Sequence, residues 1–359
     1  MKVVAAMSGG VDSAVAAALL VEQGHEVIGV HMKLHDQSPT AAVPGTCCGL
    51  DDALDARRVA ESLGIPFYVS NLRDAFKTAV MDQLADTYLA GHTPNPCIRC
   101  NGVLKFRVLL SRARALGASH LATGHYARIV SGASGPQLHE AVDAQKDQSY
   151  FLFPISNEAL NRTLFPLGGM RKDEVRAHAE RLGLAVAHKA ESQEICFIPD
   201  DDHARFVKSH RPAVDGSGEI VHEDGQVLGS HDGYFRFTVG QRRGLGVAYQ
   251  APLFVLRVEP ETRRVVVTDN PEHLSHSGLW ASGANWFDRP APDQVVQVRI
   301  RHRGRKVPCR VHAEDPIFRV DFLESERAIA PGQAAVFYQG DKVLGGAWIA
   351  RAIDPRDGQ

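Results

Sequence analysis

The segment Ser8–Ser13, read Ser-Gly-Gly-Val-Asp-Ser, is the part of the sequence best suited to hold an anion. Glycine lets backbone N–H groups approach a phosphate closely, and a helix start adds unpaired donors and the positive end of the helix dipole. The apolar run Val3–Ala6 precedes the segment, and the helix-forming run Val11–Val21 follows Gly9 and Gly10. We therefore predict a phosphate-binding turn between a strand and a helix.

The spacing lacks the Gly-Lys-Ser/Thr of a Walker loop and the spaced glycines of a dinucleotide fingerprint. It resembles the PP-loop of the ATP pyrophosphatases. That resemblance implies cleavage of ATP between the α and β phosphates and transfer of AMP to a carbonyl oxygen, which a nucleophile then displaces. The residues implied to hold ATP are Ala6, Met7, Ser8, Gly9, Gly10, Val11, Asp12 and Ser13. We expect Asp12 to orient the nucleotide or its Mg²⁺.

Short apolar runs alternate with helical stretches up to about residue 123. This alternation predicts an α/β fold whose parallel sheet carries helices on both faces and ligands at the carboxyl ends of its strands. Met32 ends the run Val27–Met32, and Gly124 follows the run Ser119–Thr123. Both therefore fall at the same edge as the phosphate-binding turn, and the family resemblance implies that they lie near the adenosine.

The cysteines supply the candidate nucleophiles. Six in 359 residues are too few for a secreted disulfide scaffold, so we expect a reducing, cytoplasmic location. Cys97 and Cys100 follow two prolines in the segment 93–101, which predicts an extended loop that holds a thiol out of the core. Cys196 lies at a polar-to-apolar junction, where a strand or loop edge could present it. A Cys-x-x-Cys pair alone fits a redox pair, half a metal site or simple packing.

The other cysteines have simpler interpretations. We expect Cys47 and Cys48 in the entry loop of a helix over Asp51–Leu63, without a shared metal. Cys309 is expected to be a small apolar residue in a strand.

Several motifs occur in a fixed order along the chain. They are Thr93-Pro94-Asn95-Pro96 with Cys100-Asn101, Thr123–Tyr126, Lys146–Tyr150, Ser192 with Ile195-Cys196-Phe197, Pro331-Gly332-Gln333 and Gly345-Gly346. In this order they resemble the bacterial tRNA-specific 2-thiouridylases. The resemblance implies ATP-dependent sulfur insertion at C2 of wobble uridine 34 in the tRNAs for lysine, glutamate and glutamine.

The resemblance also implies roles for single residues. Cys196 would carry a persulfide received from a cysteine desulfurase or a relay protein. Cys100 would complete the reaction through a transient disulfide with Cys196, and both need a thiolate-forming environment. The positions implied to contact tRNA are Asn95, Pro96, Cys97, His125, Lys146, Asp147, Gln148, Arg301, His302 and Gln333.

Cys97 departs from the family pattern, which commonly has aspartate at this position. The departure puts a carboxylate general base at this position in doubt. It also provides three thiols, Cys97, Cys100 and Cys196, that could hold a [4Fe–4S] cluster with one iron open to hydrosulfide. We prefer the persulfide route because these cysteines are distant in sequence, and we leave the cluster open. No metal ligand is certain from the sequence, and these three cysteines are the candidate iron–sulfur ligands.

Changes in the residue pattern along the chain predict three domains. They are a catalytic domain over 1–208 with a helical insertion at about 150–208, a small β-domain over 209–276, and a β-barrel over 277–359. Tyr234–Thr238 and Arg264–Thr268 are expected strand-like runs of the middle domain. Arg299–Lys306 interleaves cations with Ile300 in a strand-like pattern. We interpret this basic run as a phosphate-contacting strand, with an exposed strand made soluble by charge as the alternative.

Composition narrows the remaining choices. A net charge of −2 means that any tRNA surface must be a basic face on a near-neutral protein. No apolar run approaches the ~18 residues of a membrane span, so we expect no membrane association. A PP-loop amidotransferase or ligase, a non-catalytic tRNA-binding protein and a thiolase of another tRNA position remain alternatives. ATP turnover to AMP that requires tRNA would exclude the first two.

Overall fold

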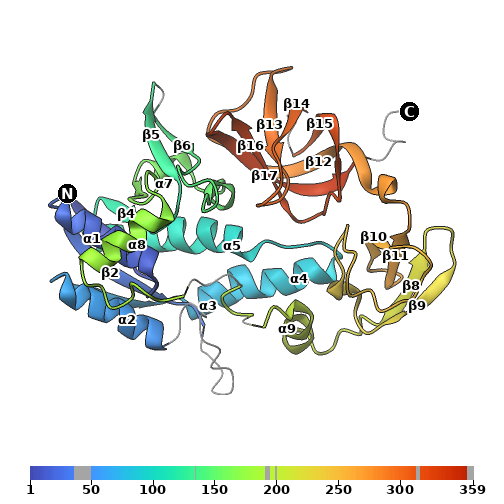
Figure 1. The fold of residues 1–359 in the computed structure, drawn as a ribbon, viewed down its shortest axis with the longest axis horizontal. Helices are drawn as coiled ribbons and strands as arrows, with labels where there is room; N and C mark the ends of the chain where they lie inside the picture. The colour runs from blue at the N-terminus through green and yellow to red at the C-terminus, as the bar shows by residue number, and fades with distance from the viewer. Residues whose placement is uncertain (36–49, 134, 191–194, 199, 313–315, 354–359) are drawn as a thin grey trace. The chain divides into compact units, whose positions relative to one another are not determined.

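The computed structural model describes residues 1–35, 50–133, 135–190, 195–198, 200–312 and 316–353. Cys47 and Cys48 therefore lie outside the described residues. The chain divides into two compact units, one formed by residues 1–81, 96–201 and 341–343, the other by 82–95, 202–340 and 344–359. Figure 1 labels many of their helices and strands.

The first unit is built on a five-stranded sheet in the order β3-β2-β1-β4-β7, in which each pair of neighbouring strands is parallel. The strands are β1 (Lys2–Ala6), β2 (Glu26–Lys33), β3 (Phe67–Asn71), β4 (His120–Ala122) and β7 (Thr163–Leu164). Val3, Val4 and Ala5 of β1 are at most 2% exposed, as expected for a central strand covered on both faces. The predicted parallel α/β fold is confirmed.

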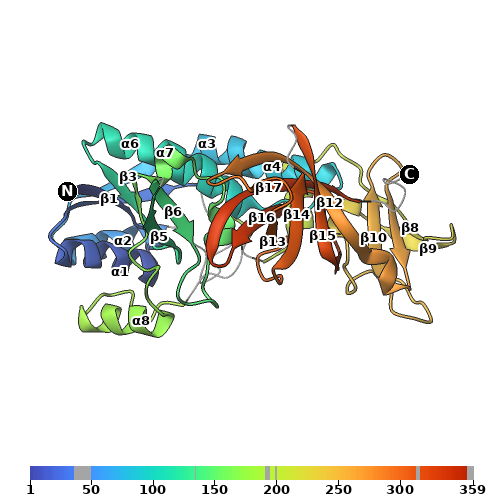
Figure 2. The same cartoon turned by 90° about the horizontal axis from the view of Figure 1, so that it is seen from above.

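Helices cover both faces of this sheet, as Figure 2 shows for α1 and α2 on one side and α3 and α6 on the other. Their bounds are α1 (Val11–Glu22), α2 (Leu50–Ser62), α3 (Arg73–Phe76) and α6 (Leu110–Ala115). Small side chains in α1, including Ala14 and Ala17, are buried in one core with Val175 and Ala179 of α8 (Lys172–Arg181). The close fit of α1 fixes the position of the helix start that follows Gly10.

Residues 96–115 form one continuous helical run, made of α5 (Pro96–Arg99), the π-helix η2 (Cys100–Leu109) and α6. The expectation of an extended loop over 93–101 is therefore wrong beyond Asn95. Proline is accepted at the first helical position, where its missing N–H would have no partner. Pro96 begins the helix, and Cys100 is buried in the core instead of being held out of it.

The remaining elements of this unit are smaller. A hairpin joins β5 (Arg128–Gly132) to β6 (Gly135–His139), and η3 (Ser149–Leu152) and α7 (Asn157–Leu160) follow. Within the helical insertion predicted at about 150–208, β7 and a run of turns separate α7 from α8. The short η1 (Lys77–Asp82) extends α3.

The second unit contains α4 (Gln83–Leu89), α9 (His203–His210) and a four-stranded sheet in the order β10-β11-β8-β9. The strands are β8 (Gly218–His222), β9 (Val227–His231), β10 (Phe254–Glu259) and β11 (Arg264–Thr268). The run Arg264–Thr268 is a strand, as predicted. Tyr234–Thr238 is not: Tyr234–Arg236 form the 3₁₀ turn η4, in which the adjacent Tyr234 and Phe235 are both buried.

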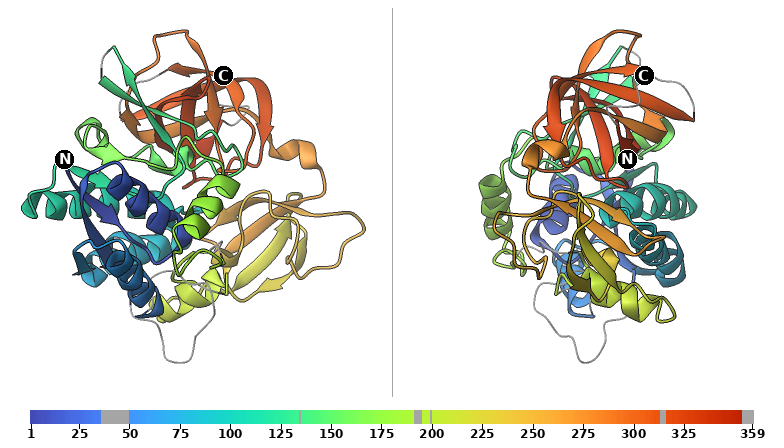
Figure 3. Two further views of the ribbon diagram at one scale, coloured as in Figure 1. Left: turned by 60° about the vertical axis from the view of Figure 1, so that its left-hand side comes forward. Right: turned by 90° about the vertical axis from the view of Figure 1, so that its right-hand side faces the viewer.

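A six-stranded barrel completes this unit, in the order β12-β15-β14-β13-β16-β17 with β12 also paired to β17. After the 3₁₀ turn η5 (Pro271–Leu274) come β12 (Ser275–Trp286), β13 (Val295–Arg299), β14 (Val307–His312), β15 (Ile317–Arg327), β16 (Ala334–Gln339) and β17 (Lys342–Ala352). Two further views in Figure 3 show its strands, in orange to red. The predicted C-terminal β-barrel is confirmed, and Cys309 lies in β14 fully buried in its core, as expected.

The basic run Arg299–Lys306 is not a strand. β13 ends at Arg299 and β14 begins at Val307. Gly304 donates its N–H to the Arg301 carbonyl at 2.9 Å, which makes a turn. Ile300 is buried while Arg301 and Arg303 are exposed, so the apparent alternation marks one buried anchor at the start of a turn.

Within the described part of the chain, none of the helices combines the length and the apolar character that crossing a membrane requires.

Candidate nucleotide and sulfur site

The loop from Ser8 to Ser13 joins the end of β1 to the start of α1. The Ser13 hydroxyl accepts the Ser8 N–H at 3.1 Å and donates to the Gly10 carbonyl at 3.0 Å, and the two serine hydroxyls lie 3.1 Å apart. These bonds close the loop on itself. The N–H groups of Gly9 and Gly10 make no hydrogen bond within the described residues, so they remain available to an anion.

Two glycines are required by close packing around this loop. Gly9 has a φ of +84°, and a Cβ on it would lie 2.4 Å from the Asp52 carbonyl oxygen. Gly124 follows β4, and a Cβ there would lie 2.8 Å from the backbone of Asp12 and Ser13. A side chain at either position would displace backbone, so both glycines hold the phosphate-binding turn in its shape.

The loop, Met32 in β2 and Gly124 after β4 all lie at the carboxyl ends of adjacent parallel strands. This is the edge at which open parallel sheets bind ligands. Free backbone donors, a helix start and a glycine-lined backbone fit a polyphosphate. The structure thus brings together the residues predicted to hold a nucleotide.

The Asp12 carboxylate is held by two groups that the sequence did not indicate. One of its oxygens, Oδ1, accepts from the Tyr126 hydroxyl at 2.8 Å and from Lys172 Nζ at 2.7 Å. The Lys172 ammonium also lies 5.7 Å from the centre of the Tyr126 ring. Lys172 is the first residue of α8, and its side chain is only 12% exposed.

Lys189 is a second cation at the loop that sequence reasoning missed. Its Nζ contacts the Gly9 carbonyl at 3.1 Å, Asp52 Oδ1 at 2.7 Å and Asp55 Oδ2 at 2.7 Å. Burial alone would lower the pKa of Lys189, but the hydrogen bonds and charges of the two aspartates outweigh it and raise the pKa. The ammonium is therefore charged at neutral pH.

His125, expected to contact tRNA, is buried. Its Nδ1 is 2.7 Å from Thr123 Oγ1 and its Nε2 is 3.3 Å from Lys105 Nζ. An ammonium only donates, so Nε2 accepts and Nδ1 carries the proton. Burial, together with the charge of Lys105, holds the pKa of His125 well below its ordinary value. The ring is neutral, and its contact with RNA remains a prediction.

The three candidate thiols belong to the same unit. Cys97 is exposed on α5, and Cys100 is buried one helical turn later. Cys196 is half-buried and packs against the apolar cluster that contains Cys100, Phe76 and Leu104. Burial raises the pKa of the Cys100 thiol, and the charge of Lys105 partly opposes that rise.

Several residues implied to contact tRNA have side chains engaged within the protein. Asp147 accepts from Ala141 N at 3.0 Å and from the Ser149 hydroxyl at 2.9 Å. Gln148 accepts from Tyr126 N at 3.0 Å. In the second unit, Gln333 donates to the carbonyls of Thr93 and Pro94 at 3.1 and 3.3 Å. These side chains shape the motif-bearing loops.

Other members of that set are more accessible. Lys146 and Asn95 are half-exposed, and Pro96 is buried at the start of α5. In the basic turn 300–306, Arg301 is exposed and His302 half-exposed. Arg301 bonds Glu326 at 3.0 Å, so an acidic neighbour on β15 offsets this part of the run.

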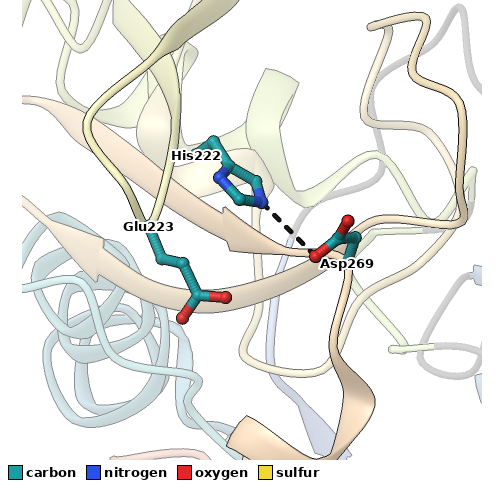
Figure 4. Close-up of side chains that lie close together, drawn as sticks. All are labelled: His222, Glu223 and Asp269. Carbon is teal, nitrogen blue, oxygen red and sulfur yellow. Dashed lines mark ion pairs between the residues drawn. The ribbon is translucent and has the colours of Figure 1, made fainter.

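A separate cluster of ionisable side chains lies at the end of β8 (Figure 4). Oxygen or nitrogen atoms of His222, Glu223 and Asp269 lie within 4.8 Å of one another. The His222 ring lies 3.0 Å from Asp224 and 3.5 Å from Asp269, and Glu223 already accepts from His273. Burial opposes the effect of Asp224 and Asp269, which together raise the pKa of His222. These contacts describe a histidine between carboxylates, which favour its protonated form.

The first unit thus has the parallel sheet, glycine turn and helix start of a HUP domain with a PP-loop. Residues 1–200 match the family described as "tRNA methyl transferase HUP domain". Residues 204–269 match "tRNA methyl transferase PRC-barrel domain", and 276–349 match "Aminomethyltransferase beta-barrel domain". The ranges of these matches do not test the predicted domain limits at 208 and 276, which stay predictions.

Curated relatives match along nearly the whole chain. The tRNA-specific 2-thiouridylase MnmA of Geotalea uraniireducens is 52% identical, covering 99% of this chain and 96% of its own length. The protein of the same name from Geobacter metallireducens is 52% identical, covering 98% of this chain and 97% of its own length. A solved 4-thiouridine synthetase–RNA complex with bound ATP is 18% identical with a TM-score of 0.38, covering 59% of this chain and 50% of that one. The chain belongs to the tRNA-specific 2-thiouridylase family.

Proposed function

We propose that this protein uses ATP to replace the C2 oxygen of a tRNA uridine with sulfur, and that the target is wobble uridine 34 of the tRNAs for lysine, glutamate and glutamine. The proposal rests on one observation: the groups suited to ATP binding and those suited to sulfur transfer lie in the same unit. The phosphate-binding turn of Gly9 and Gly10 shares a domain with Cys100 and Cys196, which pack into one apolar cluster. The names and near-complete coverage of the relatives support it.

The first step is activation of the uridine. The C2 oxygen attacks the α phosphorus, the bond to the β phosphate breaks and pyrophosphate leaves, so that the oxygen carries AMP. The N–H groups of Gly9 and Gly10 are placed to bind phosphate oxygens. The Oδ2 atom of Asp12 accepts no hydrogen bond within the described residues. That oxygen is the one we assign to Mg²⁺ or to nucleotide orientation.

The second step is sulfur transfer. A persulfide on Cys196, supplied by a cysteine desulfurase or a relay protein, attacks C2 with its terminal sulfur. The thiolate of Cys100 then attacks the Cys196 sulfur, which forms the Cys100–Cys196 disulfide and leaves the terminal sulfur on the uridine. AMP departs with the old oxygen. An external thiol must reduce the disulfide before the next turnover.

The environment of Cys100 bears on this step. Burial raises the pKa of its thiol, so nucleophilic thiolate is scarce in the ligand-free protein. The charge of Lys105 opposes this rise in pKa, so Lys105 is the cation that we expect to stabilise a Cys100 thiolate. Cys97 offers no carboxylate to act as a general base, and we assign it no step in the persulfide route.

An iron–sulfur carrier remains the alternative to the persulfide. Cys97 and Cys100 lie one helical turn apart, and Cys196 packs against the cluster around Cys100. Three thiolate ligands would leave one iron of a [4Fe–4S] cluster open. In that case the cluster would present hydrosulfide, and Cys97 would become essential.

The deciding experiment is nucleoside mass spectrometry of tRNA after anaerobic incubation with ATP, Mg²⁺ and a persulfide donor. One sample uses iron-free protein, the other the same protein after cluster reconstitution. 2-Thiouridine from the iron-free sample supports the persulfide route. Product only after reconstitution supports the cluster, and no product from either sample contradicts the proposed function.

A further inference from the structure

We infer that Lys189 is a positioning residue for the phosphate-binding turn, which sets the direction of the Gly9–Gly10 peptide so that its N–H can bind nucleotide phosphate. The inference rests on the proposed function, because it concerns the ATP step of that reaction. It stands on three contacts of one ammonium group that link the turn to α2.

The first step of the argument is the geometry of the peptide group. In a trans peptide the C=O and N–H bonds point in opposite directions. Lys189 Nζ binds the Gly9 carbonyl at 3.1 Å, so the N–H of Gly10 points away from Lys189. That N–H has no partner within the described residues and stands at the cap of α1. Holding the carbonyl therefore orients a donor for an anion.

The second step is that the peptide needs to be held. Gly9 adopts a φ of +84°, and glycine crosses between backbone regions more freely than any other residue. A flip of the Gly9–Gly10 peptide would turn a carbonyl oxygen toward the phosphates in place of an N–H. The Asp52 backbone occupies the space that a Cβ of Gly9 would take, so no side chain at Gly9 can restrict this peptide.

The third step is that Lys189 is itself fixed. An ammonium has three donors, and here the Gly9 carbonyl, Asp52 and Asp55 provide three acceptors at 3.1, 2.7 and 2.7 Å. Asp52 is buried and the Asp55 side chain is 22% exposed. α2 thus anchors the cation, and the cation anchors the turn. The two aspartates are the reason that a lysine can remain charged beneath the loop.

The test compares Lys189→Met with Lys189→Arg in the full chain. Methionine keeps the apolar stem without donors, whereas arginine restores a charged donor. We expect Lys189→Met to raise the KM for ATP in tRNA-dependent AMP formation about tenfold, with the KM for tRNA changed less than twofold. Lys189→Arg should recover most of the loss. Lys208→Met is the matched control, because it breaks a Lys–Asp pair of 2.7 Å in the other unit.

Equilibrium binding of a non-hydrolysable ATP analogue gives a readout that needs no turnover. A normal analogue affinity in Lys189→Met overturns the inference, as does an equal loss of ATP and tRNA binding with a lowered Tm. If the wild type makes no 2-thiouridine, the proposed function fails. Weakened analogue binding in Lys189→Met alone would still support the positioning role.

Discussion

Ion pairs occur both around the phosphate-binding turn and in the basic turn 300–306, yet these pairs differ in kind. Lys172 and Lys189 are mostly shielded from water, and each holds a group of the nucleotide loop. Arg301 and Arg305 are exposed and pair with Glu326. A shielded pair fixes geometry, whereas an exposed pair contributes little free energy and exchanges readily with other anions. The same residue types thus act as scaffold in one region and as a salt-sensitive surface in the other.

The largest expected effect comes from removing the two thiols that lie in the same unit as the nucleotide loop. We expect Cys100→Ser and Cys196→Ser each to reduce 2-thiouridine formation at least about 100-fold, because the sulfur has no carrier or no partner thiol. AMP formation should be affected much less, since the adenylation step needs neither thiol. Mass spectrometry of the tRNA and a pyrophosphate assay measure the two steps separately.

The barrel offers the control for that prediction. Cys309 is also buried, and burial raises its pKa to about 12, so it stays a protonated core residue. Cys309→Ala should preserve thiolation while lowering the free energy of unfolding by about 1 kcal/mol. Full sulfur transfer by Cys196→Ser would remove the persulfide route.

The second prediction concerns Asp12 and its partners. Asp12→Asn keeps the size of the side chain but removes the charge that pairs with Lys172 at 2.7 Å. We expect kcat for AMP formation to fall about 100-fold, as is typical when a group that stabilises transition-state charge is misplaced. Tyr126→Phe removes only the neutral hydrogen bond to the same oxygen and should cost less than tenfold. Equal effects of the two changes would contradict a special role for the charge.

What the sequence predicted well was local. The glycine turn, the strands before it and the position of Gly124 follow from short patterns, and the structure places them at one sheet edge. Pro96 was misread because proline punctuates loops yet also begins helices. The basic run was predicted to be a strand because Ile300 among the cations resembles the alternation of a strand. In the structure Ile300 is a single buried side chain at the start of a turn.

What the sequence missed depends on long-range contacts. Lys172 and Lys189 reach Asp12 and Gly9 across 160 and 180 residues. Neither lysine carries a local signal: a lysine in a charged helix, such as Lys172 in α8, is usually solvated surface, and Lys189 lies outside any helix. Only the fold shows which lysines leave the surface and face the nucleotide loop.

The third prediction tests whether the exposed basic turn 300–306 contacts tRNA phosphates. Arg303 forms no ion pair within the described residues, whereas Arg305 pairs with Glu324 at 2.9 Å and Glu326 at 2.8 Å. We expect Arg303→Ala to weaken tRNA binding about threefold and to reduce the slope of log K against log salt by about 1, as for the loss of one phosphate contact. Arg305→Ala should change the slope less, because it frees two carboxylates instead of a phosphate. Binding titrations at several salt concentrations measure both, and an unchanged slope in Arg303→Ala would leave the turn without a role in RNA binding.

The smallest expected effect is the pH dependence that buried His125 gives to the first region. Burial and the charge of Lys105 hold its pKa well below the ordinary 6.5, so the folded state favours the neutral ring. Its contribution to stability is therefore complete above pH 6.5 and is lost as the pH falls toward the folded-state pKa, at no more than about 1.4 kcal/mol per pH unit.

Urea unfolding at pH 7.5 and 5.5 checks this sign. His125→Gln removes the titrating group, so its free energy of unfolding should fall less between the two pH values than that of the wild type, whatever its stability at pH 7.5. His312→Gln in the barrel is the control, since it removes an exposed histidine that pairs with Asp321 at 3.0 Å. An identical pH dependence in wild type and His125→Gln would mean that His125 is solvated, and it would return this histidine to the surface available to tRNA.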